Sequence, residues 1–99
     1  MCSSSDMNQK TKILNAAMRV AESEGFGHMR RGRIAAEADV STGLINFYYG
    51  TIDLLRDAVM HAAVERKSYI IVAAGLMSGH PAARDAPEAV KAAARATLI

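Results

Sequence analysis

Apolar residues recur at helical spacing in the first quarter of the chain, and this pattern predicts an amphipathic helix over residues 9–24. Gly25 follows where helices commonly end in a left-handed cap, and Phe26 can fold back on the last turn. The apolar stripe of this helix consists of Ile13, Leu14, Ala17, Met18 and Ala21.

A second, shorter helix is predicted over residues 31–38, where Ile34, Ala35 and Ala38 share one face. Its start is weakly specified, because no Ser, Thr, Asp or Asn precedes it and Gly32 costs about 1 kcal/mol relative to alanine. We therefore expect packing, and not intrinsic propensity, to hold this helix.

A sharp corner is predicted to follow at Asp39, because aspartate tolerates positive φ better than most residues. Val40 can fill the gap between the helices, and Ser41 is a suitable N-cap for a third helix over residues 42–49. Gly50 ends that helix.

Thr51 is expected to cap a long fourth helix that runs to about residue 74. Residues 77–87 are rich in turn formers and predict a loop, after which residues 88–99 predict a fifth helix. No strand pattern and no internal repeat is present, so the expected fold is all-α. Apolar positions of the fourth helix are Leu55, Ala58, Val59, Ala62, Ala63 and Ile70.

Composition is consistent with one small soluble domain: the chain has 99 residues, of which 51% are hydrophobic, and one cysteine. Residues 1–8 are polar and are expected to form a disordered tail, with Cys2 as a bystander. The first ten residues are polar where a secretory signal would need an apolar run, so we expect no such signal, and no apolar run approaches the roughly 20 residues that cross a bilayer. These features predict a cytoplasmic protein.

The net charge of +2 does not by itself announce a nucleic-acid partner. However, Arg30, Arg31 and Arg33 fall within four residues, just before the predicted corner. This cluster is either a solvated helix end or a group that contacts phosphates.

Two short helices joined by a tight turn form the arrangement in which one helix braces against DNA and the other enters the major groove. The spacing fits, because Ala35 is small where the helices approach each other. An ordinary helical hairpin in a structural bundle is the alternative.

The outward face of the third helix favours the DNA-binding interpretation. If Ile45 and Tyr49 point inward, Asn46 and Phe47 point outward. Asn46 can present a donor and an acceptor to adenine, and Phe47 can meet a thymine methyl group, although Phe47 could instead be a core residue. Gly43 permits close approach of backbone, and Tyr48 can donate to a phosphate or be partly buried. The candidate DNA-binding residues are Arg30, Arg31, Arg33, Ser41, Thr42, Gly43, Asn46, Phe47 and Tyr48.

Residues 13–60 resemble the DNA-binding domain of the tetracycline-repressor (TetR) family of bacterial transcriptional regulators. The matching segments are ILNAA with Gly25-Phe26, IAAEADVS, GLINFYYG and DLL. The resemblance implies a repressor that binds double-stranded DNA at a palindromic operator as a homodimer and responds to a small-molecule effector. It also implies that the fourth helix relays effector binding to the DNA-reading helices.

The chain departs from the usual pattern of the family at several positions. Asp39 stands where the family usually has glycine, Arg31 where it has an apolar residue, and Asn46 where it commonly has tyrosine. Met29 and Arg30 replace the Thr or Ser that usually starts the second helix. Ile52 replaces a phosphate-binding lysine, a loss for which Arg30 or Arg33 could compensate.

The expected organisation is a disordered tail over residues 1–8, a three-helix helix-turn-helix domain over residues 9–50, and a connecting helix with a truncated effector and dimerisation domain over residues 51–99. The family is generally longer, so we expect a truncated chain or one completed by another subunit.

Two other classes of function are alternatives to a DNA-binding regulator. A protein-interaction module could use the apolar end near Leu98. An enzyme is disfavoured, because His28, His61 and His80 have no spacing typical of a triad or metal site. We therefore expect no catalytic residue, no metal and no cofactor.

Overall fold

The computed structural model describes residues 2–97, with side chains described from residue 9 onward. Over this range the chain is all-α, as predicted, and contains no strand. Its elements are α1 (Cys2–Glu24), the 3₁₀ helix η1 (Phe26–His28), α2 (Arg31–Ala38), α3 (Thr42–Tyr49), α4 (Ile52–Arg66), α5 (Tyr69–Ser78), α6 (Pro81–Arg84) and α7 (Glu88–Ala96).

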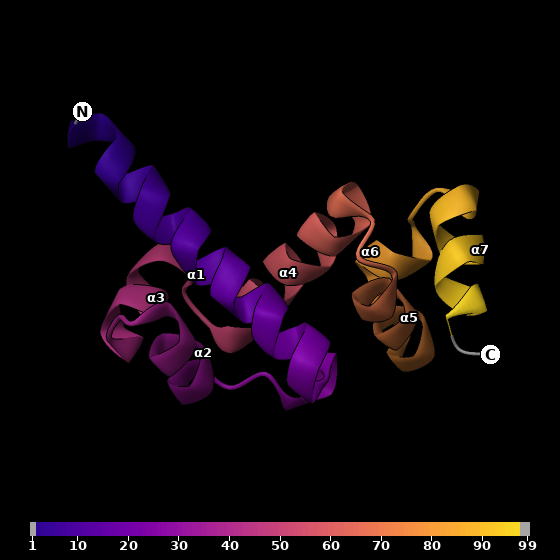
Figure 1. Ribbon diagram of the computed structural model, residues 1–99, viewed down its shortest axis with the longest axis horizontal. Helices are drawn as coiled ribbons and strands as arrows, with labels where there is room; N and C mark the ends of the chain where they lie inside the picture. Colours follow the sequence, from indigo (N-terminus) through magenta and orange to yellow (C-terminus); the bar gives the residue numbers. More distant parts are fainter. Residues whose placement is uncertain (1, 98–99) are drawn as a thin grey trace.

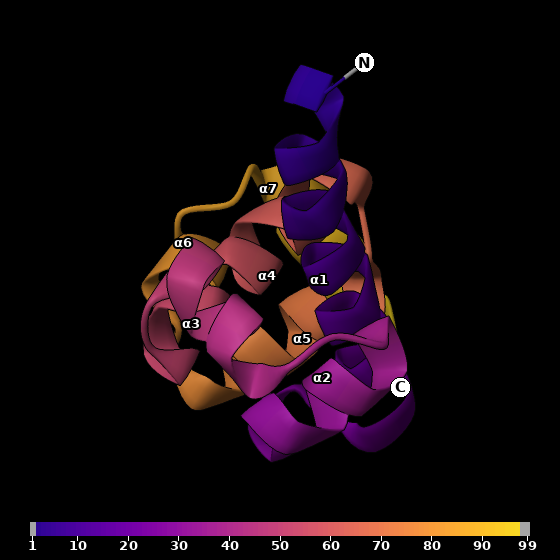
Figure 2. The same cartoon turned by 90° about the vertical axis from the view of Figure 1, so that its left-hand side faces the viewer.

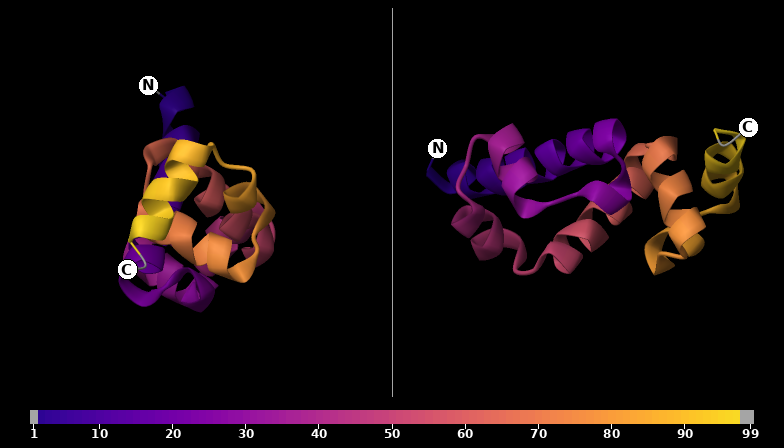
Figure 3. Two further views of the ribbon diagram at one scale, coloured as in Figure 1. Left: turned by 90° about the vertical axis from the view of Figure 1, so that its right-hand side faces the viewer. Right: turned by 90° about the horizontal axis from the view of Figure 1, so that it is seen from below.

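The helices form an elongated body of 42 × 27 × 19 Å. α1 crosses one half of the body diagonally, with α2 and α3 beneath it and α4 beside it, whereas α5, α6 and α7 gather at the other end (Figure 1). The view from below shows the same division, with α7 farthest from α3 (Figure 3). No helix among the described residues is long and apolar enough to cross a membrane.

The amphipathic faces predicted from the sequence meet in a common core. Ile13 on α1, Ile34 on α2 and Leu55 on α4 are each 0% exposed, and Ile45 on α3 is 1% exposed. Burying a side chain of this size contributes about 1.5–3 kcal/mol. The helices are therefore held together mainly by apolar packing. This agrees with the expectation that packing, and not intrinsic propensity, holds α2.

The turn chemistry predicted for the corner is confirmed. Asp39 has φ 58° and ψ 49°, and its N–H reaches the carbonyl oxygens at the end of α2. The Ser41 hydroxyl caps α3 and the Thr51 hydroxyl caps α4, in each case by accepting a hydrogen bond from a backbone N–H three residues later. Gly50, with φ 81°, ends α3.

The first helix begins at Cys2 and not at residue 9. The disordered tail expected over residues 1–8 is therefore wrong for residues 2–8, which are helical, and Met1 lies outside the described residues. Residues 2–8 lack an apolar stripe, and for this reason the periodicity gave no signal there. Extending an existing helix requires no new nucleus, which is why it can continue without such a stripe.

The long fourth helix is also corrected, because it is divided into α4 and α5 at Lys67 and Ser68. Lys67 takes a left-handed conformation with φ 58°, and the N–H of Ser68 bonds to the carbonyl oxygen of Ala63 at 2.8 Å. This is the arrangement in which a helix usually ends on glycine. Lysine in this conformation costs roughly 1–2 kcal/mol, so tertiary contacts must impose the break.

The loop predicted over residues 77–87 is a third correction. α5 continues to Ser78, Gly79 ends it with φ 75°, and Pro81 begins the short helix α6. α7 starts at Glu88 as predicted and ends at Ala96. Leu98 and Ile99, the expected apolar end of the chain, lie outside the described residues.

Gly75 and His80 hold α5 and α6 against α4. A Cβ atom on Gly75 would lie 2.8 Å from the Ala83 Cβ and 2.5 Å from the Met60 Cε, so α5 packs closely only because this side chain is absent. The His80 Nδ1 accepts a hydrogen bond from the Ala82 N–H at 3.1 Å. Its Nε2 must therefore carry the hydrogen that it shares with Asp57 at 2.8 Å.

Candidate nucleic-acid interface

α3 lies at the end of the molecule opposite α7 (Figure 1). α2 lies beside it when this end faces the viewer (Figure 2). One side chain, Ile45, is its fully buried anchor, and Tyr49 is partly buried and donates its hydroxyl to the Lys10 carbonyl oxygen at 2.9 Å. Burial raises the pKa of the Tyr49 hydroxyl. One side of α3 is thus fixed to α1 and the core, and its opposite side is exposed.

The outward face of α3 carries the residues predicted for it. Thr42, Gly43, Asn46 and Phe47 are all exposed, and Phe47 is 78% exposed. The Phe47 ring meets the Tyr48 ring edge-on, with centroids 5.1 Å apart. The Tyr48 side chain is itself half-buried, whereas the Phe47 ring faces solvent.

Ser41 organises the start of α3, because its hydroxyl oxygen accepts a hydrogen bond from the Leu44 N–H at 3.1 Å. We expect Ser41→Ala to lower the free energy of unfolding by about 1 kcal/mol, the usual cost of losing an N-cap. Thermal unfolding followed by circular dichroism measures the change.

Ser23→Ala is the matched control, because the exposed Ser23 hydroxyl bonds only to carbonyl oxygens of its own helix. We expect it to change stability by less than about 0.5 kcal/mol. Equal effects of the two substitutions would contradict a capping role for Ser41.

The three clustered arginines do not act as one patch, because their guanidinium groups have different partners. Arg31 Nη1 donates to Asn46 Oδ1 at 2.8 Å and so joins α2 to α3. Arg30 lines an open depression of about 540 Å³ together with Glu24, His28 and Arg33. The Arg30 residue is exposed, and its guanidinium group makes no hydrogen bond or ion pair with the described residues.

Arg33 is held by two carboxylates, Glu24 at 2.6 Å and Glu37 at 3.2 Å. Its hydrogen bond with Glu24 raises the pKa of Arg33, and hydrogen bonds from Arg19 and Arg33 lower the pKa of Glu37. Arg33 thus braces α2 against α1. It would have to leave both partners to reach a phosphate, which makes Arg30 the better candidate for a phosphate contact.

The N-terminus of α2 is a further polar feature of this end. No side chain caps it, since Arg30 occupies the N-cap position without a capping hydrogen bond. Uncapped N–H groups and the positive end of the helix dipole favour a phosphate at such a position. Ile52, which stands where a phosphate-binding lysine was expected from the resemblance, is partly buried against the core.

Two contacts of α3 could not be predicted from the sequence. The Lys10 ammonium lies 5.4 Å from the centroid of the Tyr49 ring, which brings a cation from α1 to the C-terminal part of α3. The bond between Arg31 and Asn46 was missed as well. Neither contact follows a sequence motif, because the partners are separated by 39 and 15 residues.

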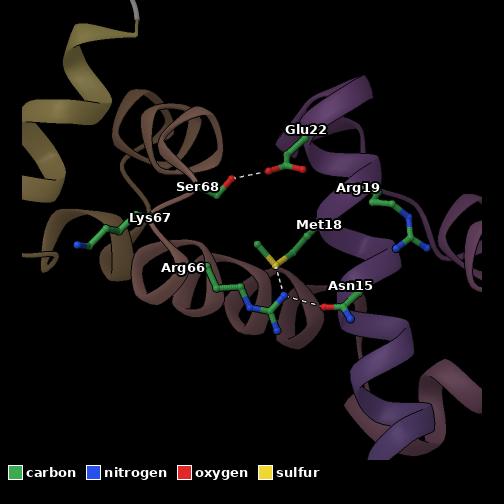
Figure 4. Close-up of a pocket in the computed structure, with 7 residues that line it drawn as sticks. All are labelled: Asn15, Met18, Arg19, Glu22, Arg66, Lys67 and Ser68. Atoms are coloured by element: carbon green, nitrogen blue, oxygen red, sulfur yellow. Dashed lines mark hydrogen bonds between the residues drawn. The ribbon is translucent and has the colours of Figure 1, made fainter.

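A second depression, of about 450 Å³, lies between α1 and the joint of α4 with α5. Arg66 donates to Asn15 at 2.7 Å, and Ser68 donates to Glu22 at 2.7 Å (Figure 4). Lys67 points away from these groups in the same view. The two hydrogen bonds join α1 to the end of α4 and the start of α5. No group of three His, Cys, Asp or Glu side chains suited to a metal gathers among the described residues.

Comparison with known proteins gives one match. Residues 13–59 fit the family described as bacterial regulatory proteins, tetR family. No curated protein and no solved structure gives a significant match. The matched segment contains about half of α1, all of η1, α2 and α3, and about half of α4, which are the elements that build and support the exposed face of α3. Residues 13–59 are therefore the amino-terminal DNA-binding domain of a bacterial regulatory protein of the tetR family.

Proposed function

We propose that this DNA-binding transcriptional regulator is a cytoplasmic repressor that binds a palindromic operator as a homodimer and is released by a small-molecule effector. In this proposal, α3 enters the major groove and α2 contacts the sugar-phosphate backbone. The two α3 helices of the dimer would contact half-sites about 34 Å apart.

The observation that carries the proposal is the exposed face of α3. A phenyl ring that is 78% exposed next to an exposed amide is costly on a plain solvent face. In a major groove, the same Phe47 ring can contact thymine methyl groups, and Asn46 can bond to a base edge. Gly43 leaves room for backbone approach, because a Cβ there would meet nothing closer than the Ser41 hydroxyl at 3.8 Å.

The proposals of a dimer and of an effector are supported by features of α5 and of its joint with α4. Ile70, Ala74 and Met77 recur along α5 at helical spacing, and Ile70 and Met77 are 60% and 74% exposed. Such a stripe is suited to association between subunits. The depression at the joint of α4 and α5 supports the effector proposal, since a molecule bound there would contact both halves of the chain.

Selection from a pool of random duplexes, followed by affinity measurements at several salt concentrations, tests the proposal. We expect one enriched palindromic motif. Phe47→Ala should weaken binding to that motif about tenfold and leave binding to scrambled duplex unchanged, because base contacts specify and phosphate contacts position.

Arg30→Ala should weaken binding to both duplexes and reduce the slope of log affinity against log salt by about 1. Lys91→Ala is the control, because Lys91 lies on α7 and pairs with Glu88 at 2.8 Å, far from α3. If no duplex is preferred over scrambled sequence at any salt concentration, the proposal is wrong, and a role in protein interaction through the α5 stripe becomes the better explanation.

A further inference from the structure

The contact between Arg31 and Asn46 constrains how α3 can recognise a base. Arg31 Nη1 lies 2.8 Å from Asn46 Oδ1, and both residues are exposed. A guanidinium group has donors only, so it must face the oxygen of the amide and not the nitrogen. The orientation of the Asn46 amide is thereby set before any DNA is bound.

Asparagine normally recognises adenine with both ends of its amide, since Oδ1 accepts from adenine N6 and Nδ2 donates to N7. In this chain the Asn46 Oδ1 already accepts one hydrogen bond from Arg31, which occupies one of its two lone pairs and leaves a weaker acceptor beside a positive charge. The Nδ2 group keeps its capacity to donate to a base. An adenine edge, which needs the amide to accept as well as to donate, is therefore disfavoured in this arrangement.

Arg31 adds donors of its own to the same place. Its remaining N–H groups are not taken by a carboxylate among the described residues, in contrast to those of Arg33, which face Glu24 and Glu37. The positive charge also polarises the Asn46 amide and makes its N–H groups stronger donors. Together the two side chains present a surface that donates hydrogen bonds more readily than it accepts them.

Guanine is the base whose major-groove edge suits such a surface. It exposes two acceptors, N7 and O6, whereas adenine exposes one acceptor and one donor, thymine one acceptor, and cytosine a donor. We propose that Arg31 is a specificity-determining residue that orients Asn46 as a donor and so selects guanine in each half-site of the operator. This inference rests on the proposed function, because it assumes that α3 enters the major groove.

The test uses the full chain and selection from random duplexes. Asn46→Ala first identifies the contacted base pair as the position where preference is lost. At that position we expect the parent protein to prefer guanine. In Arg31→Leu the amide is free to turn, and the ratio of guanine to adenine should shift at least tenfold toward adenine, within the range for one bidentate contact.

A second variant separates hydrogen bonding to Arg31 from donation to the base. Asn46→Asp keeps an oxygen for Arg31 but removes the Nδ2 donor, so the preference for guanine should fall and cytosine, which donates from N4, should gain. The matched control is Arg30→Leu, which removes an exposed arginine without contact to Asn46 and should weaken binding to all duplexes without changing the preferred base. Circular dichroism of each variant checks folding.

The outcomes distinguish this inference from the function on which it rests. If the parent protein enriches no motif, the proposed function fails. If it enriches a motif but prefers a base other than guanine at the Asn46 position, or if Arg31→Leu keeps the parent preference, the role of Arg31 is wrong and the DNA-binding function stands.

Discussion

Replacing Ile45 with alanine should lower the free energy of unfolding by about 2–5 kcal/mol, the range for large buried aliphatic side chains. Ile45 is 1% exposed, and no other side chain of α3 is fully buried. α3 has eight residues, too few for an isolated helix to be stable in water. The loss should therefore fall on α3 first. Urea unfolding measured by circular dichroism gives the change in stability.

Leu54→Ala is the matched control, because it removes the same number of carbon atoms from a side chain that is 54% exposed and lies outside the α5 stripe. It should change stability by less than about 1 kcal/mol. DNA affinity gives a second readout, since Ile45→Ala should weaken binding at temperatures where the protein is still largely folded. Equal stability loss in the two variants would show that α3 is not anchored through Ile45.

Gly75→Val should destabilise the protein by about 3 kcal/mol, at the upper end of the usual cost of overfilling a packed core. A Cβ at this position already falls 2.8 Å from the Ala83 Cβ, and alanine has no rotatable group that could move away. The flexible end of Met60 can shift, but α6 must also separate from α5. The midpoint of thermal unfolding should fall, together with the order of α6 and α7.

The control for this substitution is Gly32→Val on α2, where a Cβ would meet nothing within 4 Å. Valine and glycine differ by less than about 0.5 kcal/mol in helix propensity, so its stability should stay close to that of the parent. If Gly75→Val is equally harmless, the close packing of α5 against α4 and α6 is not required for stability.

Local chemistry explains which parts of the fold could be predicted from sequence. The boundaries of α2 and α3 follow from short-range signals, namely the left-handed conformation at Asp39 and the capping hydroxyl of Ser41. The division between α4 and α5 could not be predicted in this way. Neither Gly nor Pro marks it, and Lys67 gives no local signal for the left-handed conformation that it takes.

The candidate site shows the same division between local and long-range information. Helical periodicity predicted that Asn46 and Phe47 face outward, and both are exposed. The partners of the arginines depend on how α1, α2 and α3 pack, so sequence could not show that Arg33 faces two carboxylates while Arg31 bonds to Asn46. The contacts of these residues with DNA remain predictions.

The left-handed residue Lys67 also sets the direction in which α5, α6 and α7 extend from α4. A small rotation about the torsion angles of Lys67 displaces α7 much more than α5, because displacement grows with distance from the pivot. The Ser68–Glu22 bond lies beside the pivot and opposes rotation with little torque. His80 lies beyond the end of α5, with its ring 5.8 Å from that of Phe26, so this contact resists the same rotation at a greater distance from Lys67.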